Sequence, residues 1–325
     1  MQHTVVLPGL CEPSAAVQGP FGDIWVADDD QDDRLYTLTP NELAPRTFAT
    51  PRDQDGAAVK DLEGLTFDRT GNLWMMGSHS RSGSGKLGRR ARLVSMDPSA
   101  PGTAPIQQGS LWPAPDTPSP TALVAQLLAV CPTCAPDGDW ASLDFEGLTM
   151  EPGTDALLLG ARAPLLADGQ AWLAAVEPGD GFAVKRVHAV ALGNRGVRDL
   201  APSPTDSGVW ILAGPPGSDQ GEGFALYSWQ PGEDAKLLAL LPAVEGAPEG
   251  LWPVDAHSAW LFIDEGTRLK RDALDSADSA HRRVKKSGKV KFECGAAVPE
   301  GGTDAWAHAL QIRWQTNPAI APTIR

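Results

Sequence analysis

Short apolar segments alternate with turns rich in Gly, Asp and Pro along most of the chain. In each recurrence, an apolar segment is followed by a turn, a second segment rich in Trp or Leu, a loop and a third segment. Residues 61–67, 72–78 and 91–96 show this order clearly. Apolar runs of this length, punctuated by turn residues, are typical of antiparallel strands joined as a meander. The pattern predicts an all-β protein built from a repeated unit.

The repeat has a period of about fifty residues, which is typical of β-propeller blades. Five positions are equivalent in it: Ser14, Glu63, Glu146, Arg198 and Glu249. The one longer interval, from Glu63 to Glu146, holds a Pro-rich insertion at 111–138 with a helix expected over 121–130. We therefore predict a single propeller domain over 1–325, with five readable blades and this insertion between blades 2 and 3.

The two ends of the chain suggest how the ring closes. Residues 3–8 and 307–314 both have the pattern of strands, and pairing them in one blade would remove the seam. A sixth, degenerate blade between Arg268 and Glu300 stays open as an alternative. That stretch contains the basic run 281–291, for which a solvated loop is favoured over an anion-binding patch.

Composition agrees with a turn-rich globular protein, since 34 Gly and 29 Pro occur in 325 residues. The net charge of −14 argues against nucleic acid or an anionic membrane as partner, because both require a positive surface. Neither an apolar run of about 20 residues nor a signal peptide is visible. We expect a soluble monomer that is cytoplasmic by default.

The chain has four cysteines, too few for a disulfide-dense scaffold. Cys131 and Cys134 form a C-x-x-C pair, which could be a redox motif or half of a zinc site. A local disulfide or plain buried thiols are favoured, because no second pair and no βαβ context occur. Cys11 and Cys294, near opposite ends, could bridge if the chain closes on itself.

Charged residues gather at repeat-equivalent positions. The start of each innermost strand and the loop after the second strand should converge on one face of a propeller, where small-molecule sites form. Asp61 and Asp144 lie two residues before ring glutamates, and Asp199 follows Arg198. After the second strands come residues 28–30, His79, Arg81 and Arg162.

Three explanations compete for this ring of charge. In the first, the glutamates cap backbone amides, while the neighbouring Gly and Leu serve packing. In the second, a hard cation such as Ca²⁺ binds the carboxylates. The ligands would then be Asp61, Glu63, Asp144, Glu146 and Glu249.

The third explanation is an enzyme site, in which arginines hold an anionic substrate by charge-assisted hydrogen bonds. Arg81, Arg162 and Arg198, together with Asp199, would bind the substrate, and Glu63 and Glu146 would be catalytic. His79 is a candidate general base, with a loop-fixing histidine as its alternative.

The other sequence motifs give weaker evidence for a function. Residues 28–33 are rich in Asp, but Asp33 and Thr39 stand where an EF-hand needs Gly and Glu. Residues 78–86 have the composition of a phosphate-binding loop without the order of a P-loop. No G-x-S-x-G elbow occurs.

The Asp-x-Glu-Gly-Leu segments at 61–65 and 144–148, with 196–200, resemble an uncharacterised bacterial β-propeller family and the broader phytase-esterase-like propellers. The resemblance implies a metal-assisted hydrolase of a small anionic ester or phosphoester, with Ca²⁺ or another divalent cation and no organic cofactor. Arg198 departs from the repeated Glu and weakens the transfer of a calcium-only site. The alternative is a non-catalytic propeller that binds a ligand or a protein, on its face or on the insertion.

Overall fold

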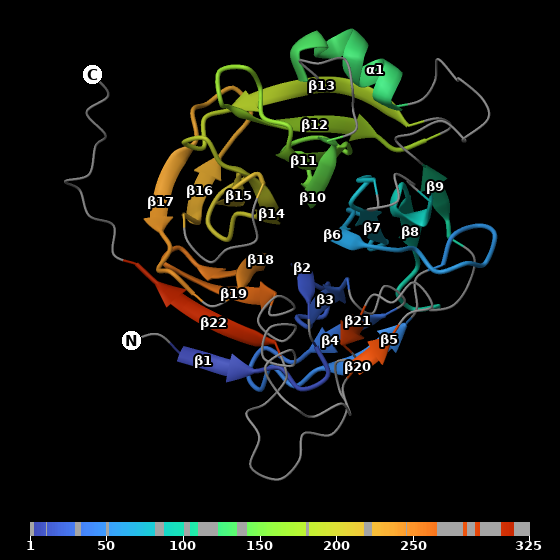
Figure 1. Ribbon diagram of the computed structural model, residues 1–325, viewed down its shortest axis with the longest axis vertical. Coiled ribbons are helices and arrows are strands. Elements are labelled where there is room, and N and C mark those ends of the chain that lie inside the picture. Colours follow the sequence, from blue (N-terminus) through green and yellow to red (C-terminus); the bar gives the residue numbers. More distant parts are fainter. Residues whose placement is uncertain are drawn as a thin grey trace.

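The protein is described by a computed structural model that covers residues 3–10, 12–29, 34–49, 52–81, 88–100, 105–109, 123–134, 142–179, 182–217, 223–244, 246–264, 282–284, 290–292 and 307–314. Five four-stranded antiparallel sheets surround a central axis (Figure 1). The innermost strands are β2, β6, β10, β14 and β18. The five-bladed propeller expected from the repeat is therefore confirmed.

Four of the five blades follow the order of the chain from the axis outward. Blade 1 consists of β2 (Pro13–Gln18), β3 (Ile24–Asp28), β4 (Leu35–Leu38) and β5 (Arg46–Ala49). Blade 2 consists of β6 (Leu62–Phe67), β7 (Leu73–Gly77), β8 (Leu93–Met96) and β9 (Gln107–Gly109). Blade 3 consists of β10 (Asp144–Met150), β11 (Leu157–Ala163), β12 (Ala171–Glu177) and β13 (Ala183–Val190). Blade 4 consists of β14 (Gly196–Pro202), β15 (Val209–Gly214), β16 (Ala225–Trp229) and β17 (Lys236–Leu240).

Blade 5 joins both ends of the chain. It consists of β18 (Ala247–Asp255), β19 (Ser258–Asp264), β22 (His308–Arg313) and, at its outer edge, β1 (His3–Val6). Thr4 pairs with Leu310, so the N-terminal strand completes the last blade, as predicted. β20 (Arg282–Val284) and β21 (Val290–Phe292) form a separate two-stranded sheet. No sixth four-stranded blade occurs among the described residues, and most of the basic run lies outside them.

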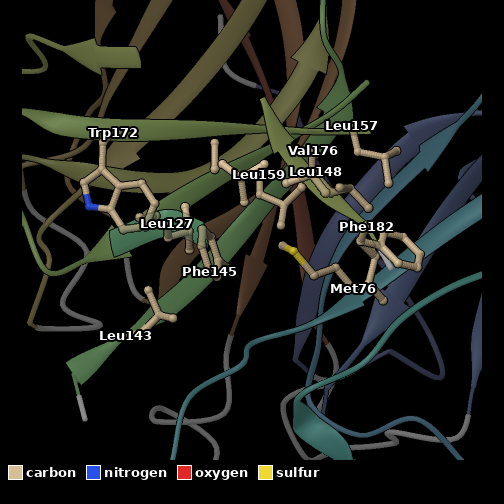
Figure 2. Close-up of a cluster of buried hydrophobic side chains, with 14 of the residues drawn as sticks. Met76, Leu127, Leu143, Phe145, Leu148, Leu157, Leu159, Trp172, Val176 and Phe182 are labelled. Atoms are coloured by element: carbon tan, nitrogen blue, oxygen red, sulfur yellow. The ribbon is translucent and has the colours of Figure 1, made fainter. Parts of the chain in front are cut away.

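Apolar faces of neighbouring blades pack against each other to form the core. Between blades 2 and 3, Met76, Leu148 and Phe145 lie among the buried side chains drawn in Figure 2. Across this interface, Trp74 of blade 2 meets Phe182, next to β13 of blade 3, edge-on with ring centroids 5.9 Å apart. Burial of each such side chain contributes roughly 1.5–3 kcal/mol, so the interfaces between blades hold the ring together.

The Gly of the repeated Glu-Gly-Leu segment permits this close packing. A Cβ atom on Gly64 would lie 2.5 Å from the Cβ of Leu148, and one on Gly147 would lie 2.6 Å from Cγ of Leu200. The Leu of one blade therefore lies directly over the Gly of the blade before it. For these two positions of the motif, packing is the reason for the residue.

The described part of the insertion lies against the outer edge of blade 3. It contains α1 (Leu123–Val130), which confirms the expected helix, and a 3₁₀ turn at Pro132–Cys134. The Gln126 side chain accepts a hydrogen bond from Val184 N at 2.9 Å and donates one to Phe182 O at 3.2 Å. Cys131 and Cys134 form a local disulfide, as one of the alternatives anticipated, while Cys11 and Cys294 lie outside the described residues.

In the part of the chain that the structure describes, no helix has the length and apolar character needed to cross a membrane.

A substitution at Gly147 tests the packing between blades 3 and 4. We expect Gly147→Ala to lower the free energy of unfolding by about 1–3 kcal/mol, because the added methyl group overpacks the interface. Gly217→Ala is the matched control, since a Cβ there meets nothing within 4 Å. Urea denaturation measures both. A coupling energy near zero between Gly147→Ala and Leu200→Ala in a double-mutant cycle would contradict the close contact of these two residues as the cause of the destabilisation.

Candidate functional site

Each of the five ring positions is the extra residue of a β-bulge. The ladder between the first and second strand of every blade skips one residue on the inner strand. The skipped residues are Ser14, Glu63, Glu146, Arg198 and Glu249. A bulge frees its residue from strict alternation and re-aims its side chain, and such bulges are common next to binding sites. The fold therefore singles out these positions independently of their chemistry.

On one side of the ring, Arg198 neutralises two of the glutamates. It has an exposed fraction of 0%. Its Nε lies 3.0 Å from Oε2 of Glu146, and its Nη2 contacts Oε1 of Glu249. Arg198 thus joins blades 3, 4 and 5 through charge. With no exposed surface, it acts as a counter-ion rather than facing solvent, although the sequence suggested substrate binding.

Arg162 neutralises carboxylates on the same side of the ring as Arg198, and we call this side the compensated region. Its Nη1 lies 2.6 Å from Oε1 of Glu146 and 3.7 Å from Oδ2 of Asp144. The Arg162 side chain is 14% exposed, whereas that of Asp144 is 23% exposed. Burial and the neighbouring Glu146 raise the pKa of Asp144 to about 8, against the opposing effect of Arg162. Asp144 can therefore carry a proton near neutral pH.

On the other side of the ring, three carboxylates from blades 1 and 2 come together. Asp29, Asp61 and Glu63 each offer an oxygen, and these oxygens lie within 4.8 Å of one another. Burial, followed by repulsion from neighbouring carboxylates, raises the pKa of both Asp29 and Glu63 well above its usual range. Within the described ranges, neither of these two makes an ion pair. Oδ1 of Asp29 is buried without a hydrogen bond there.

Asp61 is the member of this cluster that has a cationic neighbour. Arg90 Nη1 contacts its Oδ2, and Ser78 Oγ donates to the same oxygen at 2.5 Å. Asp61 directly precedes β6 and has a φ of 56°, in the left-handed region that few L residues adopt. Such strain at a charged residue is typical of functional sites.

The three carboxylates fit a hard divalent cation. Ca²⁺ takes six to eight oxygen ligands from carboxylates, carbonyls and water, so the cluster supplies part of one coordination shell. Of the five predicted metal ligands, Asp61 and Glu63 belong to it. Asp144, Glu146 and Glu249 lie instead in the region that Arg162 and Arg198 compensate.

Asp199 fastens blades to one another. Its Oδ2 accepts hydrogen bonds from Leu251 N at 2.7 Å and from Ala16 N at 3.4 Å, and its Oδ1 accepts one from Leu200 N at 2.7 Å. Ser14 acts similarly, because its Oγ donates to Leu62 O at 2.5 Å. Asp199 therefore caps backbone amides, although the sequence suggested that it contacts a substrate, and Ser14 satisfies a carbonyl of the next blade.

His79 lies buried beside the site. Its Nδ1 is 2.7 Å from Gly77 O, and its ring meets Phe145 edge-on at 6.1 Å. Burial and the nearby Arg92 lower the pKa of His79 to about 3, so the imidazole is neutral at ordinary pH. These contacts are those of a loop-fixing histidine. Arg81, the other predicted residue of this loop, is exposed.

Sequence reasoning did not assign Asp29 as a ligand of the site and missed Arg90 altogether. Asp29 belongs to the Asp-rich stretch after β3, which was placed on the correct face, but nothing in the sequence showed which aspartate meets Glu63. Arg90 lies just before β8, in a loop segment where no sequence pattern predicts the location of a side chain. Its contact with Asp61 depends on tertiary structure and could not be predicted from the sequence.

Comparison with solved structures finds distant likenesses, and the following three have TM-scores below 0.5. A gluconolactonase from Xanthomonas campestris is 13% identical, over 96% of this chain and 90% of that one, with a TM-score of 0.43. The PQQ-bound aldose sugar dehydrogenase of Streptomyces coelicolor is 12% identical, over 96% and 99% of the two chains, with a TM-score of 0.41. The RRP9 WD40 repeats are 12% identical over 81% of this chain, with a TM-score of 0.37, and this chain spans 61% of theirs. These likenesses concern the fold alone.

No family model matches the chain, and no curated protein does.

The raised pKa of Asp144 predicts a pH-dependent stability. The folded state retains a proton that the unfolded chain loses near pH 4, so the contribution of this group falls as pH rises from about 4 to about 8. In the wild type, this group makes the unfolding free energy decrease as pH rises through this window. We expect Asp144→Asn to reduce the slope of that decrease by up to about 1.4 kcal/mol per pH unit, which is the value for the loss of one bound proton. Urea denaturation at several pH values measures it.

Asp97→Asn is the control for this experiment. The Ser99 hydroxyl lowers the pKa of Asp97, so the ionisation of Asp97 changes stability only below about pH 4, outside the window in which Asp144 acts. An unchanged slope in Asp144→Asn would contradict the assignment.

Proposed function

We propose that this propeller binds a divalent cation such as Ca²⁺ at Asp29, Asp61 and Glu63 and uses it to hydrolyse a small anionic ester or phosphoester. The observation that carries the proposal is the meeting of three carboxylate oxygens from two blades within 4.8 Å, two of them on groups that make no ion pair in the described part of the chain. Uncompensated buried carboxylates are costly, and a bound cation would remove that cost.

Arg198 supports the choice of this side of the ring. A cation between Glu146 and Glu249 would lie beside a buried guanidinium that already contacts both carboxylates. Coulomb repulsion at such short range in a buried site opposes a second positive charge. We therefore assign Glu146 and Glu249 to holding Arg198, and the cation to the opposite side.

A bound divalent cation supplies polarisation of a carbonyl or phosphoryl oxygen and a more acidic water. The chain's own residues supply the rest. Asp144, which is partly exposed and protonated near neutral pH, is the group we assign to proton transfer. Glu146 positions it through Arg162, and His79 fixes the adjoining loop.

The hydrolase class follows from the resemblance of the Asp-x-Glu-Gly-Leu segments to phytase-esterase-like propellers. A propeller that binds its ligand without turnover is the alternative, because the same carboxylates could hold a cation that bridges to a ligand. Turnover separates the two. We expect the cation-loaded protein to hydrolyse at least one member of a panel of phosphoesters, carboxylesters and lactones; absence of turnover with Ca²⁺, Mg²⁺ and Mn²⁺ would favour the binding propeller.

Glu63→Gln tests the cation site directly. The substitution keeps the size of the side chain and removes one of several like charges. Without a cation we expect it to raise the melting temperature, and with Ca²⁺ we expect at least a tenfold loss of affinity in calorimetry and loss of the ligand-induced thermal shift.

Glu249→Gln is the matched control, because it occupies the equivalent bulge and contacts Arg198. We expect its Ca²⁺ affinity to stay within about threefold of the wild type. If Glu63→Gln lowers stability in the absence of cation and the wild type shows no Ca²⁺ binding, Glu63 is a structural cap and the proposal fails.

A further inference from the structure

Arg90 is held at the edge of the carboxylate cluster by its backbone. It ends a short 3₁₀ helix at Gly88–Arg90, which leads into β8. Its carbonyl oxygen accepts a hydrogen bond from His79 N at 3.1 Å, and Arg89 O accepts one from Lys60 N at 3.4 Å. The return loop of blade 2 is thereby fixed to the residues beside β6 and β7.

Of the three guanidinium nitrogens of Arg90, Nη1 is the one with a hydrogen-bond partner in the described part of the chain. Nη1 contacts Oδ2 of Asp61 and lies 3.4 Å from Oγ of Ser80. Nε and Nη2 make no hydrogen bond within the described part of the chain, and the side chain is 34% exposed. An arginine presents its donors in a rigid planar fork that matches two oxygens of a phosphate or carboxylate.

The other arginines of the site differ from Arg90. Arg198 has no exposed surface and contacts two carboxylates, and Arg162 is largely buried against two as well. Arg90 contacts one carboxylate and faces solvent. Its sequence neighbours Arg89 and Arg92 face another carboxylate, because their Nε atoms lie 3.9 and 3.6 Å from Oδ2 of Asp53.

We propose that Arg90 is the anion-binding residue of the site: its Nε and Nη2 take two oxygens of a phosphoryl or carboxylate group, while another oxygen of the ligand completes the shell of the cation at Asp29, Asp61 and Glu63. This inference rests on the proposed cation site. Three carboxylates leave ligand positions open on a cation that takes six to eight oxygens. Because Arg90 contacts Asp61 itself, an oxyanion bound to the cation would lie beside its guanidinium.

Inorganic phosphate tests the inference by calorimetry on the full chain loaded with Ca²⁺, below the solubility limit of calcium phosphate. We expect Arg90→Gln to lower phosphate affinity at least tenfold and Arg90→Lys, which keeps the charge without the fork, to lower it less. Arg89→Gln is the matched control, because Arg89 is adjacent, 50% exposed and 3.9 Å from Asp53 rather than bound to the cluster. Its phosphate affinity should stay within about twofold of the wild type.

A separate Ca²⁺ titration of Arg90→Gln keeps the two proposals distinguishable and reports whether the variant is folded. We expect its Ca²⁺ affinity to be equal to or higher than that of the wild type, because a positive neighbour of Asp61 is removed. Phosphate binding that is equal in Arg90→Gln and Arg89→Gln, or absent in Ca²⁺-loaded wild type, would overturn the role of Arg90 and leave the cation site standing. If Ca²⁺ does not bind at all, the proposed function fails, and phosphate titrations without Ca²⁺ decide on Arg90 by the same comparison.

Discussion

The buried guanidinium of Arg198 is the interaction on which the centre of this propeller depends. Five bulges aim side chains from five blades toward one region, and three of the five are glutamates. Without a positive charge among them, the ring would bury several carboxylates together at a large electrostatic cost. Arg198 compensates Glu146 and Glu249 and thereby divides the ring into a neutralised side and an acidic side. The acidic side is where the structure has capacity for a cation.

The repeated Glu-Gly-Leu segment combines architecture and chemistry in adjacent residues. Gly and Leu set the distance between blades 2, 3 and 4, since Leu148 lies over Gly64 and Leu200 lies over Gly147. The Glu occupies the bulge, where it takes no regular place in the ladder. A position that is outside the ladder can change residue without disturbing blade packing, which explains how Arg198 and Ser14 occupy the same place in other blades.

The repeat was sufficient to predict the propeller, its five readable blades and the pairing of the chain ends, because hydrophobic period and turn residues are local signals; it left a sixth blade open. It also brought Glu63, Glu146, Arg198 and Glu249 to one region. It did not show that Arg198 would face two carboxylates, or that Asp29 would lie beside Glu63, because side-chain partners depend on tertiary packing. Arg90 had no sequence signal, since its position is fixed by a hydrogen bond from His79 to its own carbonyl oxygen and one from Lys60 to that of Arg89.

Anomalous scattering from crystals of the wild-type protein grown with Mn²⁺ or Tb³⁺ would test the central claim most directly, because it locates the cation without reference to activity or stability. The division of the ring by Arg198 predicts one strong peak within coordination distance of Asp29, Asp61 and Glu63. A peak between Glu146 and Glu249, or no peak in the ring at saturating cation, would contradict it.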